Sequence, residues 1–219
     1  MPSIPTHSFA WVTLGMGCSV TWAAVALSDD LPLGMAMPCR LEGRDLAVWR
    51  SASGQAFVWG DRCPHRGMRL SQGFVRGEAL SCIYHGWRYG HDGGCVYIPA
   101  HPDLVPPKSI CATTYKCGEA DGLIWAALEE TTETIPPVPT GIPVRSMQVD
   151  AAISQVALHF GAPGETLITL QNQHPVTIAL QPVDDTCTAM HISTTERHHR
   201  KAVSRWLEQQ RAEIESAAA

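Results

Sequence analysis

The sequence has no excess of basic residues. Its 219 residues include 16 Lys and Arg against 21 Asp and Glu, which gives a formal net charge of −5. A chain without a surplus of positive charge has no electrostatic reason to bind DNA or RNA, so we expect no nucleic-acid partner. The 45% hydrophobic and 17% charged residues are instead typical of a globular protein that buries its own core.

Long uninterrupted hydrophobic runs are also absent. The most apolar stretch, Phe9 to Leu27, is interrupted by two glycines and three Ser or Thr residues and is followed by Asp29-Asp30. No basic segment precedes it, so the pattern predicts neither a signal peptide nor a membrane span. We therefore expect a cytoplasmic protein with no membrane partner.

Cysteines are plentiful, but the export signal that normally accompanies disulfides is missing. The chain has eight cysteines, and in a reducing compartment these are expected as free thiols, some of which bind metal. Only two of them have histidines at ligand spacing, in the motifs Cys63-x-His65 and Cys82-x-x-His85. Sixteen residues separate His65 from Cys82.

The first half of the chain predicts short strands separated by turn residues. Residues 46–50 and 56–59 flank a Ser53-Gly54 turn and predict a hairpin. Six glycines follow within residues 73–94. Turns at this frequency favour a small β-sandwich or barrel over helices.

A proline-rich segment precedes the second half of the chain. Residues 129–143 read EETTETIPPVPTGIP, and their prolines exclude a helix or a central strand. Four β-rich segments follow: Ala152–Phe160, Thr166–Gln171, Val176–Val183 and Thr186–Ile192. From about Thr195 to Ser216, apolar side chains recur at helical intervals, which predicts an amphipathic helix covering the sheet.

Two kinds of metal centre use two cysteines and two histidines. A tetrahedral zinc site places all four on one ion, whereas a Rieske [2Fe–2S] centre places the cysteines on one iron and the histidines on the other. Pro64, Gly67 and Gly86 predict two loop tips that Tyr84 and Trp87 can shield from water. A zinc finger would have a helix after its second cysteine, but the residues between the two pairs indicate a hairpin. The iron–sulfur centre is therefore favoured over zinc.

The motifs CPHRG (63–67) and CxYHGW (82–87) resemble the Rieske domain of ring-hydroxylating and demethylating non-haem iron oxygenases. The resemblance covers roughly residues 20–128 and includes further matching motifs: Trp49-Arg50, Asp61-Arg62, Ser71–Phe74, Gly93–Pro99 and Gly122–Trp125. Rieske proteins of the cytochrome bc type carry an extra disulfide where this chain has Met68 and Tyr84. The resemblance implies a [2Fe–2S] cluster held by four ligands: Cys63, His65, Cys82 and His85.

The resemblance also implies a mainly β fold. We expect a Rieske antiparallel β-sandwich or barrel, followed by a shortened α+β remnant of the oxygenase catalytic domain with an antiparallel sheet and a C-terminal helix. The predicted divisions are an N-terminal segment (1–19), the Rieske domain (20–128), a proline-rich linker (129–146) and the catalytic-like remnant (147–219). The remnant is expected to be an assembly surface.

The mononuclear iron site of these oxygenases has no recognisable counterpart here. In the family two histidines and one carboxylate bind this iron, but residues 129–219 lack the Asp-x-x-His pattern followed by a second histidine. The remaining possible donors are His174, His191, His198, His199, Asp184, Asp185 and Glu196. Arg197, Arg200 and Lys201 make the surroundings of His198-His199 positive, so we expect a solvated helix start there.

These observations predict the Rieske electron-transfer subunit of a multicomponent oxygenase that hydroxylates or oxidatively demethylates a small organic substrate. The chain is expected to have no catalytic residue of its own and to pass electrons through His65 and His85 to a mononuclear Fe(II) on a partner subunit. A flavin/iron–sulfur reductase or a ferredoxin would supply the electrons, in a hetero-oligomer. Two alternatives stay open: a self-sufficient oxygenase with unrecognised iron ligands, and a free Rieske ferredoxin-like carrier. A non-functional remnant is disfavoured because the four-ligand motif is intact.

Overall fold

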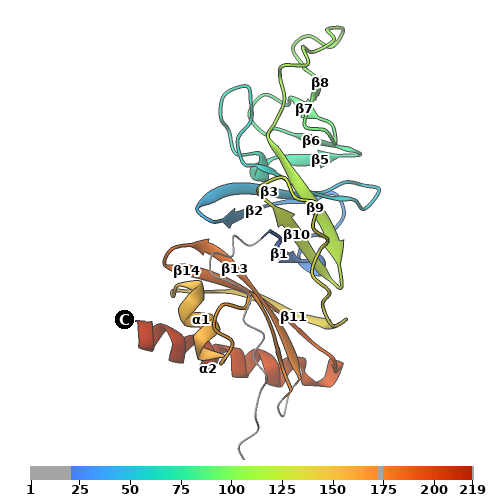
Figure 1. The fold of residues 1–219 in the computed structure, drawn as a ribbon. Coiled ribbons are helices and arrows are strands. Elements are labelled where there is room, and N and C mark those ends of the chain that lie inside the picture. Colours follow the sequence, from blue (N-terminus) through green and yellow to red (C-terminus); the bar gives the residue numbers. More distant parts are fainter. Residues whose placement is uncertain (1–20, 172–174, 219) are drawn as a thin grey trace, which may run out of the picture.

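Three antiparallel sheets and two helices make up the fold in a computed structural model that describes residues 21–171 and 175–218 (Figure 1). The first sheet has six strands in the order β1-β10-β9-β4-β3-β2. Their bounds are β1 Ala23–Leu27, β2 Ala36–Leu41, β3 Arg44–Arg50, β4 Ala56–Gly60, β9 Thr114–Ala120 and β10 Leu123–Ala127. The predicted hairpin is confirmed, because Arg50 of β3 pairs with Ala56 of β4. The N-terminal segment 1–19 lies outside the described residues.

The side chains of strand β3 are buried on both faces of the first sheet. Leu46 and Val48 pack into an apolar cluster on one face, while Ala47 and Trp49 pack into a second cluster on the other face. Arg50 ends the strand and is itself buried. Its guanidinium donates to the Glu119 carboxylate at 2.7 and 3.0 Å and to two backbone carbonyls at 2.8 Å. A buried cation needs such partners, so this pair ties β3 to β9.

The second sheet is small and holds the loops that contain the two Cys and His motifs. Its order is β5-β6-β7-β8, with bounds Phe74–Arg76, Ala79–Ser81, Arg88–Tyr89 and Cys95–Tyr97. A 3-10 turn, η2 (Leu70–Gln72), precedes β5. Figure 1 shows this sheet at the opposite end of the molecule from the C-terminal helix.

The third sheet and two helices form the C-terminal unit. The sheet order is β11-β14-β13-β12, with bounds Ile142–Val149, Cys187–Thr194, Val176–Asp184 and Leu167–Leu170. The helices are α1 (Ile153–His159) and α2 (Arg200–Ala218). Val203, Leu207 and Ile214 of α2 are buried against the sheet, which confirms the predicted amphipathic helix (Figure 1).

The β-rich interpretation of Ala152–Phe160 is wrong, because this segment contains α1. Ile153, Val156, Ala157 and Phe160 recur at helical spacing, and all four pack into the core of the C-terminal unit. The backbone N–H of Ala152 donates to the Gln155 side chain at 3.1 Å at the start of the helix. The apolar residues fit the 3.6-residue period of a helix better than the β-strand that we predicted.

Strand β11 begins at Ile142, inside the segment assigned to the linker. Its Pro143 lies on the edge of the sheet, at a register shift between Pro143 and Arg145. An edge position does not need the N–H that proline lacks, so a strand is possible there. The proline-rich segment therefore supplies the start of the third sheet.

Backbone hydrogen bonds and apolar contacts join the first and third sheets. The turn between β2 and β3 donates the N–H groups of Glu42 and Gly43 to the carbonyls of Pro182 and Val183, each at 2.8 Å. Beside this turn, Ala179 of β13 belongs to an apolar cluster with residues of β1 and β10. The third sheet is therefore covered by the first sheet on one face and by α2 on the other.

Within the described residues, neither helix combines the length and the apolar character needed to cross a membrane.

Candidate metal centre

The two Cys and His motifs form loops with the same backbone hydrogen-bond pattern. In the first loop, the N–H of Cys63 donates to the Met68 carbonyl at 2.8 Å, and the N–H of Gly67 donates to the Cys63 carbonyl at 2.8 Å. In the second loop, Cys82 and Gly86 make the equivalent bonds, to Trp87 O at 2.9 Å and to Cys82 O at 3.0 Å. Both glycines have positive φ, 71° and 69°, a conformation that side-chain-bearing residues rarely adopt. The two motifs thus form a matched pair of tight turns.

The pair of loops brings all four predicted ligands together. Cys63 and Cys82 are buried, with 4% and 2% of their surface exposed, whereas His65 is half-buried and His85 is exposed. The two imidazole rings lie 4.7 Å apart, centroid to centroid. The gap between the loops is lined by these predicted ligands together with Arg66, Met68, Tyr84 and Trp87. Thiols inside and imidazoles outside are the arrangement that a Rieske centre requires.

The spread of the donor atoms favours a two-iron cluster over a single zinc ion. A tetrahedral zinc site with bonds of 2.0–2.3 Å places its donor atoms about 3.3–3.8 Å from one another. Among the described residues, a set of three or more donor atoms all within 4.8 Å of one another occurs only at Glu196, His198 and His199. No three of the four residues in the paired loops therefore have donor atoms within 4.8 Å of one another, which is wider than the spacing around one tetrahedral ion.

The electrostatics of the loops also fit a metal cluster. Burial raises the pKa of the Cys82 thiol, so a thiolate at this position needs a bound cation to stabilise it. Partial burial, with His85 and Arg66 nearby, lowers the pKa of His65 and favours the neutral imidazole that a metal ligand must be.

Aromatic side chains hold the two imidazoles in place. Trp87 stacks on His65 with ring centroids 4.0 Å apart and planes 5° from parallel. The Tyr84 ring lies against the His85 ring, with centroids 3.9 Å apart. Leu70 is fully buried in the same apolar cluster as the two cysteines, as expected for a residue that packs beneath the site. Trp87 therefore orients His65, one of the predicted ligands, a role that the sequence did not distinguish from ordinary loop packing.

Three further residues support the site through contacts that the sequence analysis did not predict. The Tyr89 hydroxyl lies 3.0 Å from Cys63 Sγ in the buried interior. Burial raises the pKa of Tyr89, so the phenol stays protonated and donates to the sulfur. The buried Asp61 carboxylate accepts from the N–H and the hydroxyl of Ser71, both at 2.7 Å, and so closes the base of the first loop. Asp61 and Ser71 lie within matching motifs, but only the fold shows that they pair.

The possible donors among the described residues of the C-terminal unit do not form a buried metal site. His191 is buried, and both its ring nitrogens have partners: Nδ1 lies 2.9 Å from Ser146 Oγ and Nε2 lies 2.8 Å from Gln181 Oε1. Asp184 accepts from the N–H and the hydroxyl of Thr186, each at 3.0 Å. Glu196, His198 and His199 come together at the start of α2. His174 lies outside the described residues.

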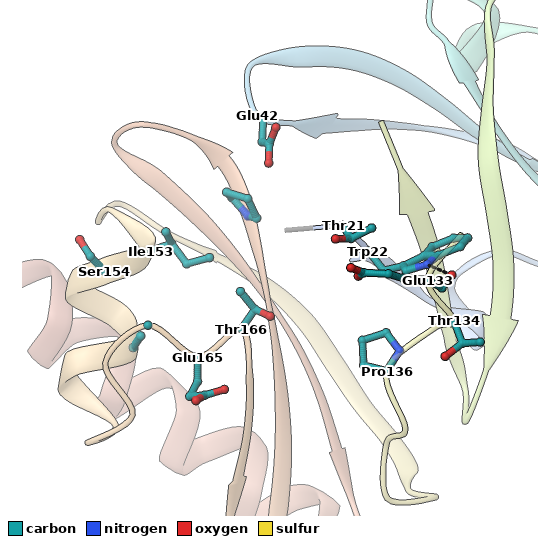
Figure 2. Close-up of a pocket in the computed structure, with 13 residues that line it drawn as sticks. Thr21, Trp22, Glu42, Glu133, Thr134, Pro136, Ile153, Ser154, Glu165 and Thr166 are labelled. Carbon is teal, nitrogen blue, oxygen red and sulfur yellow. Dashed lines mark hydrogen bonds between the residues drawn. The ribbon is translucent and has the colours of Figure 1, made fainter. Parts of the chain in front are cut away.

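A separate cavity of about 480 Å³ lies at the junction of the first and third sheets (Figure 2). Trp22, Glu133 and Pro136 line one side, while Ile153 and Thr166 line the other. The Trp22 indole N–H donates to the Glu133 carbonyl at 3.0 Å. None of the four cluster-ligand candidates lines this cavity, so it is not part of the metal site.

Two ligand loops on a small sheet, beside a larger antiparallel sheet, define a Rieske-type iron–sulfur protein. A family model described as the Rieske [2Fe-2S] domain matches residues 21–116. The chain therefore contains a Rieske [2Fe–2S] domain, and its curated relatives include an oxidoreductase and a monooxygenase.

Two curated relatives show how far the similarity extends. Oxidoreductase NdmD of Pseudomonas putida is 42% identical over 108 residues, which are 49% of this chain and 18% of that protein. The 4beta-methylsterol monooxygenase of Methylococcus capsulatus is 33% identical over 173 residues, which are 74% of this chain and 45% of that protein. The chain thus spans less than half the length of these relatives.

Solved structures share the fold beyond the Rieske domain. Apo dicamba monooxygenase matches with a TM-score of 0.74 and 18% identity, covering 90% of this chain and 85% of that chain. NdmB of Pseudomonas putida CBB5 matches with a TM-score of 0.69 and 20% identity, covering 89% and 81%. The predicted fold class, a Rieske β domain followed by an antiparallel sheet with a C-terminal helix, is confirmed.

Proposed function

We propose that this chain is the Rieske electron-transfer component of a multicomponent non-haem iron oxygenase that hydroxylates or oxidatively demethylates a small organic substrate. The observation that carries the proposal is the pair of matched loops, with thiols buried beneath imidazoles that reach the surface. Cys63, His65, Cys82 and His85 would hold the [2Fe–2S] cluster. When bound, this group supplies one-electron oxidation and reduction.

The residues around the loops would insulate one side of the site and leave the other open. Leu70 and Tyr89 exclude water beneath the cysteines, since both are fully buried. On the open side His85 is exposed, with Ile83 and Tyr84 beside it at 47% and 57% exposure. An exposed imidazole edge flanked by apolar side chains suits the brief docking of a reductase, a ferredoxin or an oxygenase subunit.

The mononuclear Fe(II) is proposed to lie on a partner subunit. Both ring nitrogens of His191 have hydrogen-bond partners inside the C-terminal unit, so its lone pair is not free to bind an iron. Glu196, His198 and His199 are close together, but the His198 side chain is 74% exposed. Oxygen activation requires a site from which water is excluded, and two of these three residues are exposed. The C-terminal unit would then provide a surface for assembly into a hetero-oligomer.

Purification from the native host with its bound partners tests the proposal. We expect about two irons and two acid-labile sulfides per copy of this chain, and co-purification of a second subunit that contains mononuclear iron. With a flavin or iron–sulfur reductase, product should form only when both subunits are present. A His85→Ala variant should remove the cluster and turnover, while His101→Ala, at another exposed histidine, is the matched control.

The two alternatives give different results in the same experiment. Turnover by this chain alone with a reductase, and about three irons per chain, would instead identify a self-sufficient oxygenase. A chain that stays monomeric and reduces several unrelated oxygenases would be a free Rieske carrier. The C-terminal unit counts against a carrier, because a carrier needs little beyond residues 21–127.

A further inference from the structure

A surface cluster of two histidines and one carboxylate lies where the third sheet leads into α2. Glu196 precedes the 3-10 turn η3 (Arg197–His199), and the N–H of His199 donates to the Glu196 carbonyl at 3.0 Å. The Glu196 carboxylate lies 3.1 Å from His198 Nε2 and 3.8 Å from His199 Nδ1. One short turn thus holds three ligand atoms on the same side, all within 4.8 Å of one another.

These separations match the coordination sphere of a small metal ion. With Zn–N and Zn–O bonds of about 2.0–2.2 Å, neighbouring ligand atoms in a tetrahedral site lie about 3.4 Å apart. The two Glu196–histidine separations, 3.1 and 3.8 Å, bracket that value. Imidazole and carboxylate together suit divalent ions such as Zn²⁺, Ni²⁺ and Cu²⁺. We propose that Glu196, His198 and His199 form a binding site for a divalent transition-metal ion, with a fourth position open to water or to a partner's side chain.

Neighbouring positive charges weaken this site but do not prevent binding. Arg197, Arg200 and Lys201 are exposed, so water and salt screen their repulsion of a cation. The three proposed ligands act by direct coordination, which solvent screening does not reduce in the same way. The balance predicts an affinity below that of a buried four-ligand zinc site. The sequence had indicated only a solvated helix start here, because it could not show that the three side chains converge.

The proposed ion site is independent of the electron-transfer function. Helix α2 lies at the opposite end of the molecule from the sheet β5–β8 that supports the paired loops (Figure 1). If the ion site is absent, the proposed electron-transfer function still stands, and the reverse also holds. Metal titration tests the first proposal and turnover with a partner subunit tests the second.

The test is a titration of tag-free holoprotein with Zn²⁺ by calorimetry, in a Cys111→Ser background that removes an exposed thiol. We expect one equivalent of Zn²⁺ to bind, and His198→Ala and Glu196→Gln each to weaken binding at least tenfold. His91→Ala is the matched control, because His91 is also exposed and pairs with a single carboxylate, Glu78, at 3.1 Å. The visible spectrum and iron content should stay unchanged in all variants.

Electron paramagnetic resonance of bound Cu²⁺ provides a second test of the proposed ligands. It is recorded on protein with an oxidised cluster, which is diamagnetic and leaves the Cu²⁺ spectrum clear. Hyperfine structure from two imidazole nitrogens is expected in the parent protein, and from one nitrogen in His198→Ala. The proposal is overturned if the parent and the His198→Ala variant bind Zn²⁺ equally. It is also overturned if His91→Ala causes the larger loss, or if the Cu²⁺ spectrum shows no nitrogen that depends on His198.

Discussion

At the residue scale, Tyr89 contacts the sulfur of a proposed cluster ligand. Its hydroxyl lies 3.0 Å from Cys63 Sγ. A hydrogen bond to this sulfur is stronger when the cluster is reduced and more negative, so it favours reduction. We expect Tyr89→Phe to lower the reduction potential by tens of millivolts, since a hydrogen bond to a charged group contributes about 1.5–3 kcal/mol at most. A redox titration followed by electron paramagnetic resonance measures this shift.

Tyr97→Phe is the control for this substitution. The Tyr97 ring packs against Arg88. The nearby Cys95 Sγ contacts the backbone carbonyl of Tyr97. Its removal should leave the potential unchanged. Equal shifts in the two variants would mean that the Tyr89 hydrogen bond does not set the potential.

His191 should make the stability of the protein depend on pH. Burial lowers the pKa of His191 from 6.5 to about 4, so the folded state favours the neutral ring while the unfolded state gains a proton below pH 6.5. Its stabilisation is therefore complete above pH 6.5 and decreases as the pH falls toward 4. Between pH 7 and 5 we expect a loss of about 2 kcal/mol, from 1.36 kcal/mol per pKa unit. Urea unfolding at several pH values measures it.

A His191→Gln variant isolates this effect, because glutamine keeps a polar group in the buried position but does not titrate. Its free energy of unfolding should depend less steeply on pH in the same range. The same slope in both proteins would assign the pH dependence to other groups.

At the element scale, helix α2 stabilises the third sheet through its buried face. Leu207 is fully buried in the core that α2 shares with the sheet. We expect Leu207→Ala to lower the free energy of unfolding by about 2–5 kcal/mol, because the substitution leaves a cavity. Leu158→Ala on α1, where the side chain is 65% exposed, should change it by less than about 0.5 kcal/mol. Similar losses at the two sites in urea unfolding would argue against the packing described for α2.

At the scale of the whole molecule, Gln181 links the C-terminal unit to the first sheet. Its buried amide donates to Cys39 Sγ at 3.1 Å and to the Arg40 carbonyl at 2.7 Å, and its carbonyl oxygen lies 2.8 Å from His191 Nε2. We expect Gln181→Leu to cost about 1–3 kcal/mol, because it leaves buried polar groups without partners. This loss of stability should weaken the contact between the C-terminal unit and the first sheet.

Two spectroscopic probes can follow this junction during heating. Visible circular dichroism reports the cluster, and far-ultraviolet circular dichroism reports all three sheets. The two transitions should coincide in the parent protein and separate in Gln181→Leu, with Gln209→Leu on the exposed face of α2 as the control. Coincident transitions in Gln181→Leu would mean that other contacts are enough to couple the units.

The sequence by itself determined the features that depend on a few neighbouring residues. The ligand loops follow from Cys and His spacing with glycines at the turns, and α2 follows from apolar residues at helical intervals. The same local rules were misleading for Ala152–Phe160, where a short apolar segment fits both helix and strand and its packing selects the helix.

Only the tertiary structure decided which distant residues meet. Tyr89 reaches Cys63 because β7 lies beneath the first loop, and Gln181 reaches Cys39 because the third sheet packs on the first. The convergence of Glu196 with His198 and His199 depends on how a single turn orients three side chains. Such contacts depend on how sheets stack and which way side chains point, and residue spacing carries little information about either.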